Sequence, residues 1–529
     1  MKRVRVWVGV WAAAASVATA QTNGVWNQNA SGYWTDPAMW ASALIGSGIG
    51  ATGNFRNLDI SAARIVTLTN DITIGHMLFA DLGGAGNNDW WVTNAVAAGD
   101  VSTGLLTLAV SSGVPTISVT NRSLNLGATL AGTQGFTKTG NGSLYMRNTN
   151  SVITGPIRVE GAFHQVLSEY VYGPVPGAPL SNAISYGNVT VQNWDSYLTY
   201  STNRGMTLVA NSFFRSGWGK QTTIESPITG PGGLGVAFDG AYLLVMNQAN
   251  DYSGNTIVGN NPNSWDNNGS FAALRLGNDE VLPDGYGRGV LVVTNGATAV
   301  ANKWNSYVQM NGFSETVNGL VGNGVISNNG AAAVTLTLGA GRGGGIFTGV
   351  IDDAGNGNLG ITKIGGGAQF LAGTNNFDGD VVIREGLLGL GGAGGVGGGV
   401  TVHARAVLGV GLTNVAQNLV VNGVLRATNA TVAVNLTDTT TQGNGVNDLL
   451  ELGTVELEGV NTFAVFPLRP LAVGSPYTVA TYFGFSGGGT LAGSAPGTRY
   501  TIAVDDSTPG EIRLTDRKST RLNSSHVSQ

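Results

Sequence analysis

Cysteine is absent from this sequence, and charged residues are scarce. None of the 529 residues is Cys, and 11% are Asp, Glu, Lys or Arg, against roughly 25% in ordinary soluble domains. The absence of cysteine excludes disulfide bonds and thiol chemistry. Surface helices need charge on their outer faces, so the low charge argues against a largely helical fold. Stability therefore has to come from hydrogen-bonded strands and packed apolar side chains.

Residues that commonly carry catalysis or bind metals are few and scattered. The histidines do not stand at metal-ligand spacings: they are His76, His164, His403 and His526. No nucleophile elbow occurs, and the glycine runs 391–395 and 397–399 are not followed by the Lys-Ser/Thr of a phosphate-binding loop. From the residues alone we assign no catalytic, metal-binding or cofactor-binding residue, and we expect a protein that is not an enzyme.

The overall charge also limits the classes of partner. The formal net charge is −5, and Lys and Arg do not cluster, which argues against a nucleic-acid partner. After the N-terminal region, no segment has the ~20 apolar residues that a transmembrane helix needs.

What the sequence has in abundance is glycine, asparagine and β-branched residues. There are 83 glycines, about twice the usual share of ~7%. Gly and Asn adopt the positive φ angles of tight turns, whereas Val, Thr and Ile favour pleated strands. With 42% hydrophobic residues the chain is not disordered throughout. The composition predicts an all-β protein of many short strands.

Three stretches repeat one strand–turn–strand pattern, at about residues 138–161, 243–259 and 363–388. In the third stretch a strand at 370–371 precedes an Asn-containing turn, Gly379 and a β-branched strand at 381–383. Such a unit cannot bury its apolar face alone and has to stack on its neighbours. Asn-Gly pairs, as at 311–312 and 422–423, also favour hairpins, but the strict hairpin rhythm is missing. We therefore predict a β-solenoid over residues 92–426 with roughly 20–25 residues per coil.

The N-terminal residues indicate export and a capped solenoid. Residues 1–20 combine a basic start, an apolar run and a small-residue cleavage site, as in a secretory signal peptide. Residues 21–91 hold Trp26, Tyr33, Trp34 and Trp40, which either plug the end of the solenoid or stack on sugars. We favour the plug and expect an N-terminal β cap.

Two further segments are expected at the C-terminal end. In residues 427–515, prolines interrupt the strand-like segments, and alternation of apolar and polar residues then resumes. This pattern predicts a small closing β-module. Residues 516–529 lack glycine and alternation and are similar to the translation of a sequencing adapter. We interpret them as non-native and expect a C-terminally truncated protein.

The repeated unit resembles the autotransporter-associated β-strand repeat, also called the passenger-associated transport repeat. The resemblance covers the three marked stretches, although the first has an extra turn residue and the second lacks the Lys-x-Gly-x-Gly opening of the third. It implies a secreted right-handed parallel β-helix, which is exported through an outer-membrane barrel or held at the cell surface by another C-terminal signal.

Taken together, these features predict a monomeric, secreted or surface-displayed protein of a Gram-negative-type bacterium, with a structural or adhesive role and an extracellular glycan or cell-surface partner. One alternative is a β-helix polysaccharide lyase or glycoside hydrolase, whose site would draw on Asp251, Asp352, Asp353, Lys363 and Arg384. Another is an outer-membrane β-barrel fragment, against which the short strands argue.

Overall fold

The computed structural model describes residues 21–83, 88–94, 104–193, 197–217, 219–237, 241–259, 271–295, 305–355 and 358–517. The expected signal peptide and most of the expected adapter-like tail lie outside these ranges, as does His526. The chain divides into two compact units. Unit 1 comprises Met1–Ile157 and Tyr170–Pro174, and unit 2 comprises Arg158–Glu169 and Val175–Gln529.

Unit 1 consists of three stacks of parallel strands. The first stack contains β1 (Gly24–Val25), β3 (Thr52–Phe55), β6 (His76–Phe79), β9 (Thr116–Val119) and β12 (Phe136–Thr139). The second contains β2 (Gly32–Tyr33), β4 (Arg64–Leu68), β7 (Trp90–Asn94), β10 (Ser123–Gly127) and β13 (Ser143–Met146). The third contains β5 (Ile72–Ile74), β8 (Leu105–Leu108), β11 (Thr129–Gly132) and β14 (Val152–Ile153). Two 3₁₀ turns, η1 (Pro37–Met39) and η2 (Ala41–Ala43), lie between β2 and β3.

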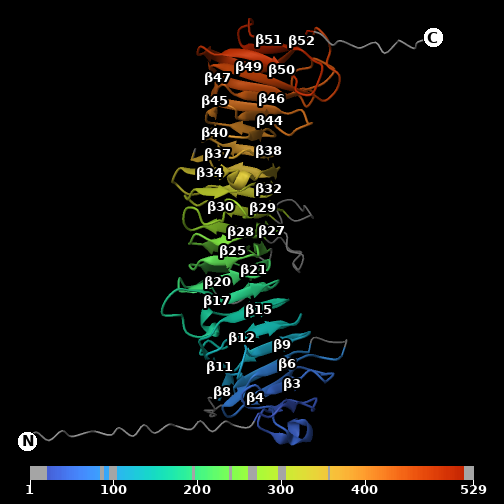
Figure 1. Cartoon of the computed structure of the whole chain (residues 1–529), viewed down its shortest axis with the longest axis vertical. Helices are drawn as coiled ribbons and strands as arrows, with labels where there is room; N and C mark the ends of the chain where they lie inside the picture. Colours follow the sequence, from blue (N-terminus) through green and yellow to red (C-terminus); the bar gives the residue numbers. More distant parts are fainter. Residues whose placement is uncertain are drawn as a thin grey trace, which may run out of the picture. The chain divides into compact units, whose positions relative to one another are not determined.

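Unit 2 repeats the arrangement over more coils, which lie one above the other within this unit (Figure 1). Its stack A contains β16 (Phe163–Val166), β18 (Thr190–Asn193), β21 (Ser212–Ser216), β24 (Leu234–Ala237), β27 (Thr256–Gly259), β29 (Leu291–Thr294), β32 (Leu320–Gly322), β35 (Gly345–Phe347), β38 (Ala368–Leu371), β41 (Leu387–Leu390), β44 (Val407–Val410), β46 (Thr431–Leu436), β48 (Val460–Pro467) and β50 (Thr490–Ser494).

Stack B of unit 2 contains β19 (Leu198–Tyr200), β22 (Gln221–Ile224), β25 (Ala241–Met246), β28 (Phe271–Leu276), β30 (Ser306–Gln309), β33 (Val325–Ser327), β36 (Val350–Asp352), β39 (Thr374–Phe377) and β42 (Gly394–Val396). Stack C contains β17 (Leu180–Gly187), β20 (Arg204–Leu208), β23 (Ile228–Gly230) and β26 (Asp251–Tyr252), then β31 (Glu315–Val317), β34 (Val334–Leu338), β37 (Leu359–Lys363), β40 (Val381–Ile383) and β43 (Val400–Val402).

Three long strands belong to both stack B and stack C: β45 (Asn418–Thr428), β47 (Leu449–Glu458) and β49 (Pro476–Ser486). The last strands of the unit are β51 (Ile502–Asp505) and β52 (Glu511–Asp516), and η4 (Ala340–Arg342) is a short turn after β34. Two elements span the sequence boundaries between the units, β15 (Ile157–Glu160) and η3 (Glu169–Tyr172).

Paired neighbours in each stack run parallel, and their register is continuous except for shifts in the β17–β20 and β45–β47 pairs. Among the described residues, β26 and β31 follow each other in stack C without pairing. Phe370 lies opposite Gly389, which lies opposite Gly409, so one coil takes about 20 residues. Among the strand pairs that the structure describes, only those of β52 with β49 and β51 are antiparallel. The Asn-Gly pairs that lie within the described ranges therefore do not form hairpins. At the corner Asn311-Gly312, both residues take the positive φ that this dipeptide tolerates, 55° and 87°.

Side chains alternate along each strand, as a two-residue period requires. In β41, Leu388 and Leu390 are fully buried between the stacks, whereas Leu387 is part-exposed. Repetition of this pattern builds one apolar core through successive coils of each unit. The chain is thus an all-β protein folded as a right-handed parallel β-helix, as the sequence predicts.

The tryptophans of the opening segment fill the interior of unit 1. All are at most 2% exposed: Trp26, Trp34, Trp40 and, from β7, Trp90. Their rings contact the ring of Phe55 at centroid distances of 5.4–5.6 Å. The indole N–H of Trp34 donates to the carbonyl of Gly46 at 2.9 Å. These four rings have no exposed face for a sugar. That they plug the end of the solenoid stays a prediction.

The parallel stacking of unit 2 is closed by β52, which runs back against β49. Its pairs extend from Pro476 to Thr481 of β49 and stop before Phe483. Asp516, the last residue of β52, is buried and lies opposite Ile502. An antiparallel closing strand covers most of the edge that a parallel stack exposes at its end.

Candidate functional site

The carboxylates that a polysaccharide-cleaving site would use serve turns instead. Asp353 is 1% exposed and accepts backbone N–H bonds at 2.9–3.2 Å from Gly355, Asn358 and Asp378. Asp352 accepts the N–H of Ala354 at 2.9 Å. Each side chain holds the loop between β36 and β37 in shape, which is the usual work of Asp in turns.

The other candidates for that site point elsewhere. Lys363 is fully buried, Arg384 is exposed, and Asp251 forms an ion pair with Arg288. Within the described ranges, no three His, Asp or Glu side chains come close enough to hold a metal ion. His164 is buried and His403 is exposed, while Nδ1 of His76 lies 2.7 Å from the hydroxyl of Thr116. The structure brings Lys363 and Arg384 to adjacent coils, where the N–H of Arg384 donates to the carbonyl of Lys363 at 2.9 Å, but one side chain is buried and the other is exposed.

Lys363 has a different role, inside the solenoid. Its Nζ donates to three backbone carbonyls, at 2.6 Å to Ile364, 2.6 Å to Gly365 and 3.2 Å to Glu385. Burial lowers the pKa of Lys363 to about 8, and the charge of Glu385 opposes that shift. The ammonium therefore satisfies the carbonyls of two successive coils.

Two buried carboxylates in unit 2 have raised pKa values. Burial raises the pKa of Glu315 to about 9, partly opposed by the N–H of Val281, which donates at 3.0 Å. Burial raises the pKa of Asp448 to about 7, although its oxygens accept N–H bonds from Asn435 at 2.6 Å and Gln417 at 2.7 Å. Both groups join separate coils, so we assign them to the scaffold.

The first hollow on the outer surface of unit 2 arises from glycines in stack A. One outward ladder position carries, in successive coils, Phe370, Gly389, Gly409 and Ala433. The ring of Phe370 lies over Gly389, where an added Cβ would meet it at 2.4 Å. Gly409 has no such cover, because the nearest atom to an added Cβ is 3.5 Å away. The column thus leaves Gly409 at the bottom of a depression.

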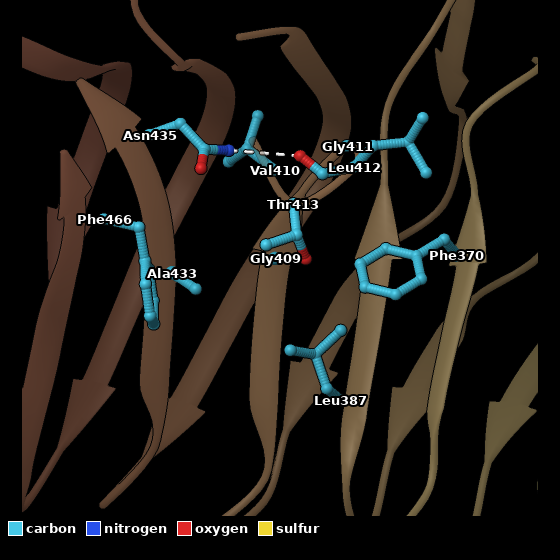
Figure 2. A pocket seen from close by; sticks show the side chains of 10 residues that line it. All are labelled: Phe370, Leu387, Gly409, Val410, Gly411, Leu412, Thr413, Ala433, Asn435 and Phe466. Carbon is cyan, nitrogen blue, oxygen red and sulfur yellow. Dashed lines mark hydrogen bonds between the residues drawn. The ribbon is translucent and has the colours of Figure 1, made fainter. Parts of the chain in front are cut away.

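This glycine-floored hollow has a volume of about 180 Å³ and a mainly apolar lining (Figure 2). Phe370 and Phe466 stand at its two ends, and Leu387 lies along one side (Figure 2). The loop after β44 borders it and is fixed by the amide of Asn435, which donates to the carbonyl of Leu412 at 3.2 Å. The hollow can hold a small apolar group, but it offers few polar atoms for recognition.

The second hollow lies where β45, β47 and β49 bend from stack B into stack C. At the bend the pairing of β45 shifts between Val421 and Val424. Neighbouring coils approach so closely there that a Cβ on Gly453 would meet the carbonyl oxygen of Asn422 at 2.4 Å. The resulting bend groove has a volume of about 350 Å³ and is lined by Val420, Val421, Asn422, Glu451, Leu452, Gly453, Thr481, Tyr482 and Phe483.

Polar and aromatic side chains meet in the bend groove. Glu451 and Thr481 face outward at the same ladder position of adjacent coils. Asn422 is exposed at the corner, and the ring of Phe483 is 98% exposed. The groove therefore combines a free aromatic face with a carboxylate, an amide and a hydroxyl. This is the combination of polar and apolar groups that small polar ligands require.

Neither hollow was identified from the sequence. A signal for the first is present, because Leu388-Gly389-Leu390 and Leu408-Gly409-Val410 place glycine at an outward position twice, one coil apart. The bend groove has a weaker signal. Asn422-Gly423 predicts a turn, whereas the structure has a bend inside one continuous strand, β45.

Comparison with known proteins shows similarity to a distant relative. Over 321 residues, or 58% of this chain, the sequence is 28% identical to the adhesin BmaC autotransporter of Brucella suis biovar 1 (strain 1330). The matched part is 8% of that protein's length. No protein-family model matches the chain. The chain is thus similar to part of a bacterial autotransporter adhesin.

The described residues include no helix with the length and hydropathy needed to cross a bilayer.

Proposed function

We propose that this chain is the passenger region of a surface-exposed bacterial adhesin, in which a β-helix displays binding surfaces outside the cell. The observation that carries the proposal is the similarity to an autotransporter adhesin, found in a chain that is itself a parallel β-helix. The proposal includes export by residues 1–20 and membership of the passenger-associated repeat class.

The physical properties of the solenoid support a role in binding. Each coil gives its backbone N–H and C=O groups to its neighbours, so the outer faces stay rigid without disulfide bonds. Repetition places outward side chains about 4.8 Å apart along a stack, which suits many weak contacts with one extended partner. The partner that we propose is a cell-surface glycan.

Catalysis has less support than binding. A β-helix lyase or hydrolase needs carboxylates and a cation converging in one groove. In the part of the chain that the structure describes, Asp353 holds a turn and Lys363 is sealed inside the solenoid. The name of the distant relative is that of an adhesin.

An adhesion assay tests the proposal directly. Fluorescent beads coated with the full chain are incubated with epithelial cells, with and without excess soluble chain. We expect more bound beads than with an albumin coating, and soluble chain should compete for that binding. Beads coated with heat-unfolded chain are the matched control, because the composition is the same and the fold is lost. Equal binding of all three coatings would contradict an adhesive role.

A further inference from the structure

We propose that the bend groove of unit 2 binds an uncharged saccharide, with Phe483 as the stacking face and Glu451, Asn422 and Thr481 as partners of the sugar hydroxyls. The inference rests on the proposed adhesive function and adds to it a site and a ligand class. The groove lies within strands β45, β47 and β49, all of which belong to unit 2.

The exposed ring of Phe483 is the first argument. Phenylalanine is usually buried, yet this side chain is 98% exposed. A large apolar side chain left in water beside a cavity usually marks a contact surface. A pyranose ring has an apolar face of C–H groups and a rim of hydroxyls, so it can lay that face on an aromatic ring while its rim stays polar.

The polar groups beside the ring are the second argument. The carboxylate of Glu451 accepts hydrogen bonds, and the hydroxyl of Thr481 both donates and accepts. These two residues are direct ladder partners, so they stand about 4.8 Å apart along the stack. The amide of Asn422 adds a donor and an acceptor at the corner. A sugar ring stacked on Phe483 would thus meet both hydrogen-bond donors and hydrogen-bond acceptors.

Charge favours an uncharged ligand over an acidic one. Glu451 places a carboxylate in the groove, and the whole chain has a net charge of −5. On stack C, the outward cation of β45, Arg426, forms an ion pair with Glu456 at 2.8 Å. A uronic or sialic acid would therefore meet repulsion in the groove.

The groove is also preformed. Its walls are paired strands, and the residues behind them, such as Val421 and Leu452, are at most 4% exposed. Asn418 donates to Oε1 of Glu451 at 3.1 Å, which restricts the carboxylate before any ligand arrives. A rigid site loses little conformational entropy on binding, which benefits a weak, polar ligand. The volume of about 350 Å³ falls at the small end of the ~300–1,000 Å³ typical of ligand sites.

A second copy of the chain is the alternative ligand of the groove, because the backbone edge of β49 beside Phe483 is not covered by β52. The pairing of β52 with that strand ends at Thr481, which leaves only Tyr482–Ser486 beyond it. A segment this short is a weak template for strand pairing. The polar groups of the groove also face outward from the strands and not along their edge, which favours a ligand lying across the coils.

The test is binding of defined oligosaccharides to the full chain, measured by calorimetry and saturation-transfer NMR. The probes are cellohexaose, maltohexaose, mannohexaose and chitohexaose, with oligogalacturonate as the acidic comparison. Phe483→Ala and Glu451→Gln remove the ring and the charge. Phe466→Ala is the matched control, because this phenylalanine is 39% exposed in the glycine-floored hollow.

We expect at least one uncharged hexamer to bind saturably and oligogalacturonate to bind more weakly. Phe483→Ala and Glu451→Gln should each weaken binding by about tenfold or more, and Phe466→Ala by less than about twofold. Phe483 is so exposed that its loss should leave the fold intact, which the thermal midpoint checks.

Three results would overturn the inference. In the first, a hexamer binds with equal affinity to wild type and Phe483→Ala. In the second, no uncharged hexamer binds although coated beads still adhere, so the groove assignment fails and the adhesive function stands. In the third, wild type is a dimer that Phe483→Ala converts to a monomer, so the occupant is a second copy. Failure of the beads to adhere bears instead on the proposed function.

Discussion

The Nζ atom of Lys363 donates a hydrogen bond of 2.6 Å to the carbonyl oxygen of Gly365, two residues further on. The turn that makes this possible needs glycine. Gly365 has a φ of +63°, and an added Cβ would meet the carbonyl oxygen of Gly339 in the preceding coil at 2.3 Å. In unit 1, Lys138 donates to the carbonyl of Gly140 at 2.7 Å, and Gly140 has a φ of +85°.

The Lys-x-Gly opening of the first and third repeats therefore has a structural explanation. Lys138 is the second-last residue of β12 and Lys363 is the last residue of β37. Each side chain points into the solenoid and donates to a carbonyl at the corner that follows. Both lysines are fully buried. A buried ammonium is tolerated because polar acceptors surround it. The Lys-x-Gly motif of the repeat thus stabilises a corner of the solenoid from inside and is not a surface binding feature.

We expect Lys363→Met to destabilise unit 2 by about 2–4 kcal/mol, because it leaves the three carbonyls without their donor in a buried setting. Chemical denaturation followed by circular dichroism measures the loss, and hydrogen exchange should place it at β37 and β41. Arg384→Met is the control, since that side chain is exposed and its loss should change stability by less than about 0.5 kcal/mol. Equal losses of stability in the two variants would contradict a stabilising role of the buried Lys363 ammonium.

Gly389 and Gly409 provide a matched pair one coil apart. We expect Gly389→Ala to destabilise unit 2 by about 1–3 kcal/mol, because the new Cβ would meet the ring of Phe370 and the carbonyl of Gly411, each at 2.4 Å. Gly409→Ala should be neutral or slightly stabilising, since its Cβ finds atoms only at 3.5 Å and beyond. Thermal midpoints of the two variants measure the difference. A lower thermal midpoint for Gly409→Ala than for Gly389→Ala would contradict the assignment of Gly409 to the floor of the hollow.

Stability should fall as the pH rises from about 5 to 8. Above pH 8 the lowered pKa of Lys363, about 8, acts in the opposite direction, because the folded state has then lost a proton that the unfolded lysine still holds. A carboxylic acid whose pKa is raised by folding contributes stability that is full below its unfolded pKa and lost as the pH rises through its folded pKa. For Asp448 the window runs from 3.8 to about 7, and for Glu315 from 4.5 to about 9. Between pH 7 and 9, Glu315 accounts for a loss of up to about 1.4 kcal/mol per pH unit.

Glu315→Gln tests this assignment, because the amide does not titrate and its oxygen, placed where Oε2 lies, can still accept the N–H bonds of Val281 and Leu282. Denaturation midpoints measured from pH 4 to 9 should decline less steeply above pH 7 in the variant than in wild type. Parallel curves above pH 7 would mean that another group dominates this range.

Composition and turn residues were enough to predict an all-β protein of short strands, since they act locally. The right-handed parallel β-helix was expected from the family resemblance. Arg64–Leu68, Ile72–Ile74 and Val334–Leu338 carry the β-branched residues that favour strands, and each is a strand in the structure. The alternation of Val, Thr and Leu in such segments sets the buried face before any coil stacks. Stacking then follows, because each strand needs partners for its backbone groups.

The hollows could not be predicted, because they depend on register between coils. Gly389 and Gly409 occupy equivalent places in the sequence, yet only one is covered by a ring from the coil before it. Likewise, the Asn-Gly pair at 422–423 and the corner pair at 311–312 look alike, but one bends a continuous strand and the other ends one. The adjacent coil, and not the dipeptide itself, decides whether Asn-Gly bends a strand or ends it.

The tryptophan plug gives the last prediction, which concerns the N-terminal end of unit 1. Trp34 is fully buried, packs against Trp40 and Phe55, and donates its indole N–H to Gly46. Trp34→Ala should cost about 3–5 kcal/mol, because it removes a large apolar side chain and leaves a cavity next to the first coils. Tyr33→Ala is the neighbouring control, since that ring is 54% exposed. In a stack of coils stability passes from neighbour to neighbour, so Trp34→Ala should raise hydrogen exchange most at β3 and β4 and progressively less toward β13. A uniform rise along unit 1 would argue against a plug that acts from the end of the solenoid.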